Sequence, residues 1–151
     1  MQGCCFIGHK DCPFTIKDTL YKTIEKLITE KNVTTFYVGT QGSFDKLVYD
    51  VLCELESIYK IEIYVVMAYL NNDCKDIYYD KTKSIYPDVL TTTPLRFAIR
   101  KRNSYMIDKS DYVICYMNDP FSNTFNNIKE AIKKNKHIEN LGSFTLKCIS
   151  N

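Results

Sequence analysis

The chain has 151 residues, of which 45% are hydrophobic and 25% charged, and its net charge is +2. This length and composition are typical of one globular domain with a sizeable core. No apolar run approaches the roughly 18 residues of a membrane-spanning helix, so we expect no membrane segment. The low net charge gives no sign of a nucleic acid partner, so we expect neither DNA nor RNA.

Cysteine and histidine usage excludes two further classes. The seven cysteines are an odd number at irregular spacing and form no Cys-x-x-Cys pair, so they do not resemble a disulfide framework. Only two histidines are present, without the paired spacing of zinc ligands. The N-terminus lacks the pattern of a signal peptide. We therefore expect a cytoplasmic protein without a metal or a cofactor.

Strand and helix patterns alternate along the chain. In chain order they predict a strand at 4–8, a helix at 13–31, a strand at 34–39, a helix at 43–57 and a strand at 61–70. After a long connection at 71–93, a helix is predicted at 93–110, a strand at 111–117, a helix at 125–136 and a strand at 137–141. This order predicts an α/β fold of three layers, with a mostly parallel sheet of about five strands.

We take residues 1–151 as one domain, with its core at about 4–142 and a peripheral tail at 143–151. Tyr78, Tyr79 and Tyr86 of the long connection could stack on a base, although tyrosines in a long loop more often cover core.

Right-handed crossovers would bring every strand-to-helix loop to the carboxyl edge of the sheet, where ligands bind in such folds. Three polar loops follow strands here: "GHKD" at 8–11, "GTQGSFD" at 39–45 and "NDPFSNT" at 118–124. Each loop alone is compatible with an ordinary turn. The glycines of the second loop also permit a phosphate cradle, because free N–H groups at a helix start favour an anion. Together, the three loops favour a ligand site.

The segment "RFAIRKRN" at 96–103 is strongly basic. Arg96, Arg100 and Asn103 are spaced to share one face of a helix, whereas Arg102 would point elsewhere. Such a face suits a phosphate or a carboxylate, and the alternative is a solvated basic surface. His9 could act as a base, stack on a ring or serve the turn, and Asp45 could interact with the helix dipole or accept from a ribose hydroxyl.

These motifs together resemble the SLOG superfamily, and more narrowly its small bacterial and phage branch related to the YpsA proteins. The resemblance covers about residues 4–142 and includes "CCFIGHKD", "TTFYVGTQGSFDKLVYDVL" and "TPLRFAIRKRNSYMIDKSDYVICYM". It implies a Rossmann-like fold with a pocket for a nucleotide-derived molecule. The residues that match family positions are Gly8, His9, Gly39, Gln41, Gly42, Phe44, Asp45, Arg96, Arg102, Asn103, Met106, Ser110 and Asp111. The family pattern thus favours Arg102 over Arg100, which a bend or a helix end near Asn103 would explain.

The superfamily includes Lonely-guy phosphoribohydrolases and immune sensor domains that bind ADP-ribose-type signals. The hydrolases carry a Pro-Gly-Gly-x-Gly-Thr-x-x-Glu loop after the fourth strand, where this chain has Phe121, Ser122, Asn123 and Thr124. Their catalytic carboxylate falls here at Lys129 or at a shifted Glu130. This departure counts against hydrolysis.

The leading hypothesis is therefore a protein that binds a nucleotide or an ADP-ribose-type signal, as a sensor or a sequestering protein in bacterial or phage immunity. The alternatives are a nucleotide N-glycosidase, with Asp45, Glu130 and Arg102 as candidate catalytic residues, and an interaction module with a vestigial pocket. A homodimer or higher homo-oligomer is expected. The expected ligand contacts are Gly8, His9, Lys10, Gly39, Thr40, Gln41, Gly42, Ser43, Phe44, Asp45, Arg96, Arg102, Asn103, Ser122, Asn123 and Thr124.

Overall fold

The computed structural model describes residues 2–70 and 83–144. In this part of the chain, six strands form one parallel sheet in the order β4-β3-β2-β1-β5-β6. The strands are β1 (Gln2–Gly8), β2 (Val33–Val38), β3 (Glu62–Val66), β4 (Ser84–Ile85), β5 (Tyr112–Tyr116) and β6 (His137–Asn140). The helices are α1 (Lys17–Lys31), α2 (Gly42–Glu56), α3 (Ala98–Asp108) and α4 (Asn123–Lys133). None of the helices in these two ranges is long and apolar enough to cross a membrane.

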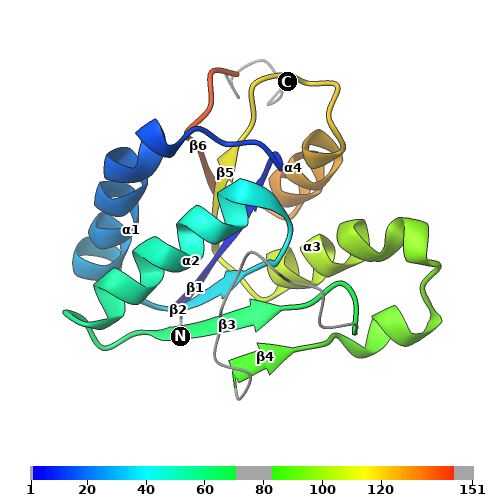
Figure 1. The fold of residues 1–151 in the computed structure, drawn as a ribbon, viewed down its shortest axis with the longest axis horizontal. Helices are drawn as coiled ribbons and strands as arrows, with labels where there is room; N and C mark the ends of the chain where they lie inside the picture. Colours follow the sequence, from blue (N-terminus) through cyan, green and yellow to red (C-terminus); the bar gives the residue numbers. More distant parts are fainter. Residues whose placement is uncertain (1, 71–82, 145–151) are drawn as a thin grey trace.

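The helices cover both faces of the sheet. Figure 1 shows α1 and α2 on one side of the strands and α3 and α4 on the other. The predicted α/β fold of three layers is therefore confirmed. The sheet has six strands instead of about five, because the two-residue strand β4 forms inside the expected long connection and pairs with β3.

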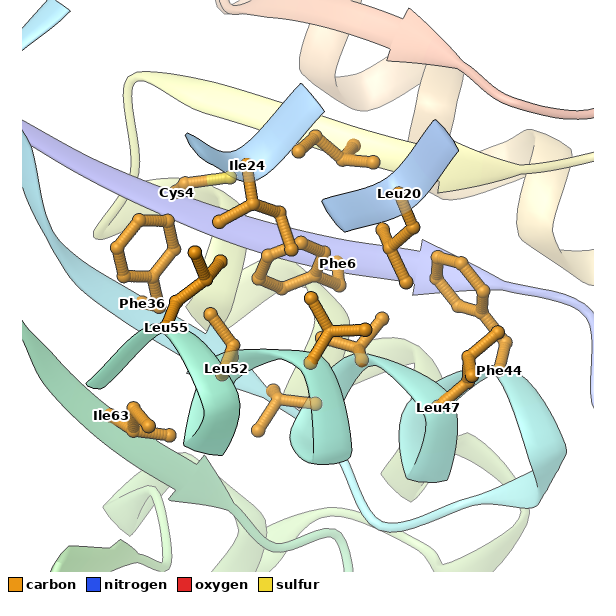
Figure 2. Packing of buried hydrophobic residues seen from close by; sticks show 14 of the residues in the cluster. Cys4, Phe6, Leu20, Ile24, Phe36, Phe44, Leu47, Leu52, Leu55 and Ile63 are labelled. Atoms are coloured by element: carbon orange, nitrogen blue, oxygen red, sulfur yellow. The ribbon is translucent and has the colours of Figure 1, made fainter. Parts of the chain in front are cut away.

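The larger part of the core lies between the sheet and the pair α1 and α2. Figure 2 shows Phe6 and Phe36 of adjacent strands against side chains of α2 such as Leu52 and Leu55, all fully buried. The buried residues of α2 form an apolar stripe that consists of Phe44, Leu47, Val48, Val51, Leu52 and Leu55. Burying one such side chain contributes about 1.5–3 kcal/mol, so this stripe fixes the helix on the sheet.

Two of the predicted elements differ from the structure in ways that affect the pocket. The strand expected at 61–70 stops at Val66, because Ala68 packs against Leu90 and Ala98 instead of continuing the sheet. The helix expected at 93–110 begins as a separate 3₁₀ turn at Leu95–Phe97, and the α-helix starts only at Ala98. Of the three tyrosines of the long connection, Tyr86 packs against this same cluster, whereas 78 and 79 lie outside the described residues.

The connectivity reverses at the centre of the sheet. From β1 the chain builds β2, β3 and β4 to one side, then returns to place β5 and β6 on the other side of β1. The carboxyl ends of β1 and β5 lie side by side, with Gly8 opposite Tyr116. The loops after these two strands lead to helices on opposite faces, which opens a crevice at this point of the edge.

Candidate ligand-binding site

A pocket of about 470 Å³ occupies this crevice. Its wall comes from the end of β1, the β2–α2 loop, the start of α3 and the start of α4. The lining residues are Phe6, Ile7, Gly8, His9, Lys10, Gln41, Asp45, Arg96, Phe97, Ile99, Arg100, Arg102, Asn103, Ser122, Asn123, Thr124, Asn126 and Asn127. Its volume lies within the range of ligand pockets in proteins, about 300–1,000 Å³.

The wall of the pocket is cationic. Among the described residues that line it, the cations Lys10, Arg96, Arg100 and Arg102 face one carboxylate, that of Asp45. Arg96 and Arg100 are exposed and lie at the mouth, whereas Arg102 is only 3% exposed. A concave site with more cationic than anionic side chains attracts an anion.

Asp45 and Arg102 meet at the base of the pocket, against the backbone of Gly39. A Cβ at Gly39 would lie 2.2 Å from Nη1 of Arg102 and 2.7 Å from Oδ2 of Asp45. Burial raises the pKa of Asp45, while the nearby guanidinium and the N–H of Gln41, which donates to Oδ2 at 2.8 Å, lower it. Gly39 thus leaves room for a buried pair of opposite charges.

Buried polar side chains continue from Arg102 toward α4. Its Nε donates to Oδ1 of Asn103 at 2.9 Å and its Nη1 to the carbonyl of Val66 at 3.2 Å. Asn103 donates to Asn127 at 3.3 Å, and Asn127 donates to Glu130 at 3.3 Å. Such a satisfied network fixes the orientation of its members, so the amides on the pocket wall are held before any ligand binds.

His9 connects the loops on the two sides of the crevice. The ring Nε2 of His9 accepts from the backbone N–H of Asn118 at 2.9 Å, and the backbone N–H of His9 donates to the carbonyl of Tyr116 at 3.1 Å. An accepting Nε2 implies that the proton of the neutral ring is on Nδ1. In this arrangement Nε2 serves the structure of the site and is not free to act as a base.

The first turn of α2 holds the loop that follows β1. The N–H and the hydroxyl of Ser43 both donate to the carbonyl of Lys10, at 2.6 and 2.7 Å, and the hydroxyl accepts from the N–H of Cys12 at 2.7 Å. Gly42 has φ +90°, and a Cβ there would lie 2.6 Å from Cα of Lys10. This end of α2 is therefore occupied by the protein's own backbone.

The start of α4 is different, because a polar group there has no partner. Ser122 precedes the helix, and its Oγ is buried without a hydrogen bond to any described residue. Ser122, Asn123 and Thr124 all lie on the pocket wall. A buried hydroxyl without a partner costs free energy, and a ligand oxygen at this position would satisfy it.

The family model for YpsA, described as the YspA SLOG family, matches residues 4–150. The chain belongs to this SLOG family. Two solved structures share the fold of this SLOG protein, both of DNA processing protein A (DprA). The protein from Streptococcus pneumoniae superimposes with a TM-score of 0.64 at 15% identity, over 93% of this chain and 50% of that one. The Helicobacter pylori protein superimposes with a TM-score of 0.58 at 16% identity, over 99% of this chain and 79% of that one.

This SLOG protein thus spans about half the length of the Streptococcus pneumoniae structure. A search of curated proteins gave no match. The Helicobacter pylori structure is described by its single-stranded DNA binding mode. Our expectation of no DNA or RNA partner is therefore wrong: this fold includes a protein that binds DNA, and a low net charge over a whole chain does not exclude a local cationic surface. The expected homo-oligomer stays a prediction.

The structure brings eleven of the expected contacts of this SLOG protein together on the pocket wall. They are Gly8, His9, Lys10, Gln41, Asp45, Arg96, Arg102, Asn103, Ser122, Asn123 and Thr124. Five others lie off the wall: Gly39, Thr40, Gly42, Ser43 and Phe44. Of these, Gly39 makes room for Arg102, and Phe44 fills the space beside Gly8, where a Cβ would lie 2.4 Å from its ring. Among the expected contacts in the second loop, only Gln41 and Asp45 line the pocket.

Arg96, Arg100 and Asn103 all line the pocket, but they do not belong to one continuous α-helix, because Arg96 belongs to the 3₁₀ turn before α3. The bend that we expected near Asn103 lies instead before Ala98. Both Arg100 and Arg102 reach the wall, from its exposed rim and its buried base respectively. The predicted preference for Arg102 over Arg100 is therefore incomplete, because both arginines line the pocket.

Sequence reasoning missed several residues of the wall, namely Phe6, Ile7, Phe97, Ile99, Asn126 and Asn127. Asn127 left a detectable signal, because it lies beside Ile128 on the apolar face of α4 and is only 2% exposed. A polar residue on such a face needs a partner inside the protein. No group of three or more His, Cys, Asp or Glu side chains suited to a metal occurs in the described ranges.

Proposed function

We propose that this SLOG protein binds a nucleotide-derived small molecule in the pocket at the carboxyl edge of the sheet. The observation that carries the proposal is the cationic wall, whose lining contains four cations, one buried carboxylate and the unpartnered hydroxyl of Ser122. A phosphate fits this chemistry, because arginine donors and the N-terminus of α4 converge on the same space. Asn103 supplies an amide for a ribose or a base, and Asn127 holds it in place by accepting from its Nδ2.

The proposed orientation places the phosphate at Ser122–Thr124, between the start of α4 and the rim arginines. His9 and the loop after β1 border the same space. The proposal drops the phosphate cradle at 39–43, since the N–H of Ser43 already donates to Lys10. As a biological role we propose a cytoplasmic sensor or a protein that sequesters a nucleotide signal, including ADP-ribose-type signals of bacterial or phage immunity.

A binding experiment tests the proposal directly. Equilibrium dialysis or calorimetry with AMP, ADP-ribose and cyclic ADP-ribose isomers should give saturable binding. Arg96→Ala and Arg100→Ala each remove an exposed cation from the mouth and should weaken binding about tenfold, as expected for a hydrogen bond to a charged group.

Lys22→Ala is the matched control, because Lys22 is an exposed cation of α1 that does not line the pocket. Unchanged affinity in both arginine variants, or saturable binding of none of these compounds, would refute the proposed site.

The second candidate is hydrolysis of a nucleotide to release its base, with Asp45 as the carboxylate. Its support is that Asp45 is buried on the pocket wall with a raised pKa, a common property of catalytic acids. Glu130, the other candidate, lies off this wall and is engaged by Ser104 and Lys134. Incubation with nucleoside monophosphates followed by chromatography separates the candidates: free base indicates hydrolysis, and intact ligand recovered from denatured protein indicates binding.

A further inference from the structure

A second cavity, of about 680 Å³, lies between α3 and α4 beside the pocket. We call it the α3–α4 groove, and its lining residues are Phe97, Arg100, Lys101, Ser104, Asn126, Lys129, Glu130 and Lys133. Three of them, Phe97, Arg100 and Asn126, also line the pocket. The two cavities are therefore neighbours with a common wall, and one extended molecule can occupy both.

The groove carries an excess of positive charge. Arg100 and Lys101 lie on α3, and Lys129 and Lys133 lie on α4, all of them exposed. None of these four side chains takes part in an ion pair within the described ranges. Lys129 and Lys133 are also four residues apart on one helix, an arrangement of like charges that destabilises a helix. A bound anion would remove this repulsion.

The acidic residue of the groove does not neutralise these cations. The carboxylate of Glu130 accepts from the hydroxyl of Ser104 at 2.8 Å and pairs with Nζ of Lys134 at 3.2 Å. Lys134 lies outside the lining of the groove. Glu130 is thus engaged by Ser104 within the groove and by Lys134 beside it. The lining holds four cations, of which Lys129 also lies 5.0 Å from the ring centroid of Phe125.

An aromatic ring stands at the junction of the two cavities. Phe97 is 41% exposed and contributes to both linings, and the guanidinium of Arg96 lies 4.8 Å from its ring centroid. An exposed ring between two cationic surfaces is the combination with which proteins hold a base between consecutive phosphates of a single strand.

We propose that the α3–α4 groove binds the second phosphate of a short nucleotide chain, either a free dinucleotide or the end of a longer single strand. The first nucleotide lies in the pocket, Phe97 contacts a base at the junction, and the following phosphate lies between Arg100 and Lys129. This inference rests on the proposed function, since it assumes that the pocket holds the first nucleotide.

The experiment compares three 5′-phosphorylated ligands: a mononucleotide, the dinucleotide of the same base and a single-stranded octanucleotide. Calorimetry should give a dinucleotide affinity at least about tenfold above that of the mononucleotide, because a further phosphate gains charge-assisted hydrogen bonds. The octanucleotide distinguishes the source of the ligand: equal affinity to the dinucleotide indicates a dinucleotide site, and higher affinity indicates a strand.

Lys129→Gln and Lys133→Gln should each reduce the gain in affinity of the longer ligands over the mononucleotide, and should leave the affinity for the mononucleotide unchanged. The double variant should abolish this gain. Lys22→Gln on α1 is the control. Both lysines are exposed, so circular dichroism should show a normal fold. Equal affinities for one and two nucleotides, or an undiminished gain in the double variant, would overturn the inference and leave the proposed function standing. Absence of mononucleotide binding would overturn this inference alone if ADP-ribose still binds, and would refute the proposed function as well if none of the compounds named above binds.

Discussion

The substitution Gly39→Ala tests the arrangement at the base of the pocket. A Cβ at this position would lie 2.2 Å from Nη1 and 2.6 Å from Cζ of Arg102. Ordinary carbon contacts are about 3.5–4.0 Å, so the guanidinium would have to move by more than about 1 Å. Such a movement breaks its hydrogen bonds to Val66 and Asn103, because both require the present position of the group.

The expected cost combines two opposing effects. Losing or straining hydrogen bonds of a buried charged group costs about 1.5–3 kcal/mol each. Alanine offsets about 0.4–1 kcal/mol by restricting the unfolded chain. We expect Gly39→Ala to lower the free energy of unfolding by about 2–5 kcal/mol, which in a chain of this size corresponds to roughly 4–20 °C in melting temperature.

Urea unfolding followed by circular dichroism measures this change. Arg102→Met supplies the control background, because it removes the guanidinium that the new methyl group would displace. In that background Gly39→Ala should be milder by about 1 kcal/mol or more, which a double-mutant cycle detects. A Gly39→Ala protein as stable as the wild type, or an equal loss in both backgrounds, would refute the close packing of Arg102 on Gly39.

Three further results are expected. Ser43→Ala should destabilise the protein by about 1–2 kcal/mol in urea unfolding, because the hydroxyl serves two backbone groups of the loop after β1; a neutral effect would contradict this attachment. Burial raises the pKa of Asp45 above 3.8, so its contribution to stability is fully present below pH 3.8 and is lost as the pH rises through the folded-state pKa. Asp45→Asn lacks this titration, so the stability difference between wild type and variant should shift in favour of the variant as the pH rises above 3.8, and a difference independent of pH would refute the assignment. Burial raises the pKa of Cys5 and of Cys115 to about 12, so iodoacetamide at neutral pH should label exposed Cys53 in the native protein and these two only after denaturation, as peptide mass spectrometry would show; native labelling of either would contradict its burial.

Much of the architecture could be predicted because it depends on patterns that lie within single segments. The residue pattern of each segment predicted the helix at 43–57 and the strand at 111–117, which the structure contains as α2 and β5. The alternation of such elements predicted the parallel sheet. The position of the pocket follows from the same order, since loops after parallel strands share one edge.

The predictions that were wrong concern features that depend on contacts between distant segments of the chain. The roles of Gly39 and Gly42 are set by Arg102 and Lys10, which belong to other elements. The split of the expected helix before Ala98 follows from Ala98 packing against Leu90 and Ala68, a contact across the long connection. Local spacing contains no information on such partners, and so the side chains that reach the pocket could be predicted only in part.

The connections made by His9 and Ser43 bear on the thermodynamics of binding. His9 attaches the loop after β1 to the loop after β5, and Ser43 attaches it to the first turn of α2. With both attachments made in the free protein, a ligand does not have to order this side of its site. The conformational entropy lost on association is then small, which leaves more of each contact's energy as affinity. We expect the backbone of the loop after β1 to differ little between the free and the ligand-bound protein. The rates of ligand binding and release would then depend on the side chains at the rim of the pocket.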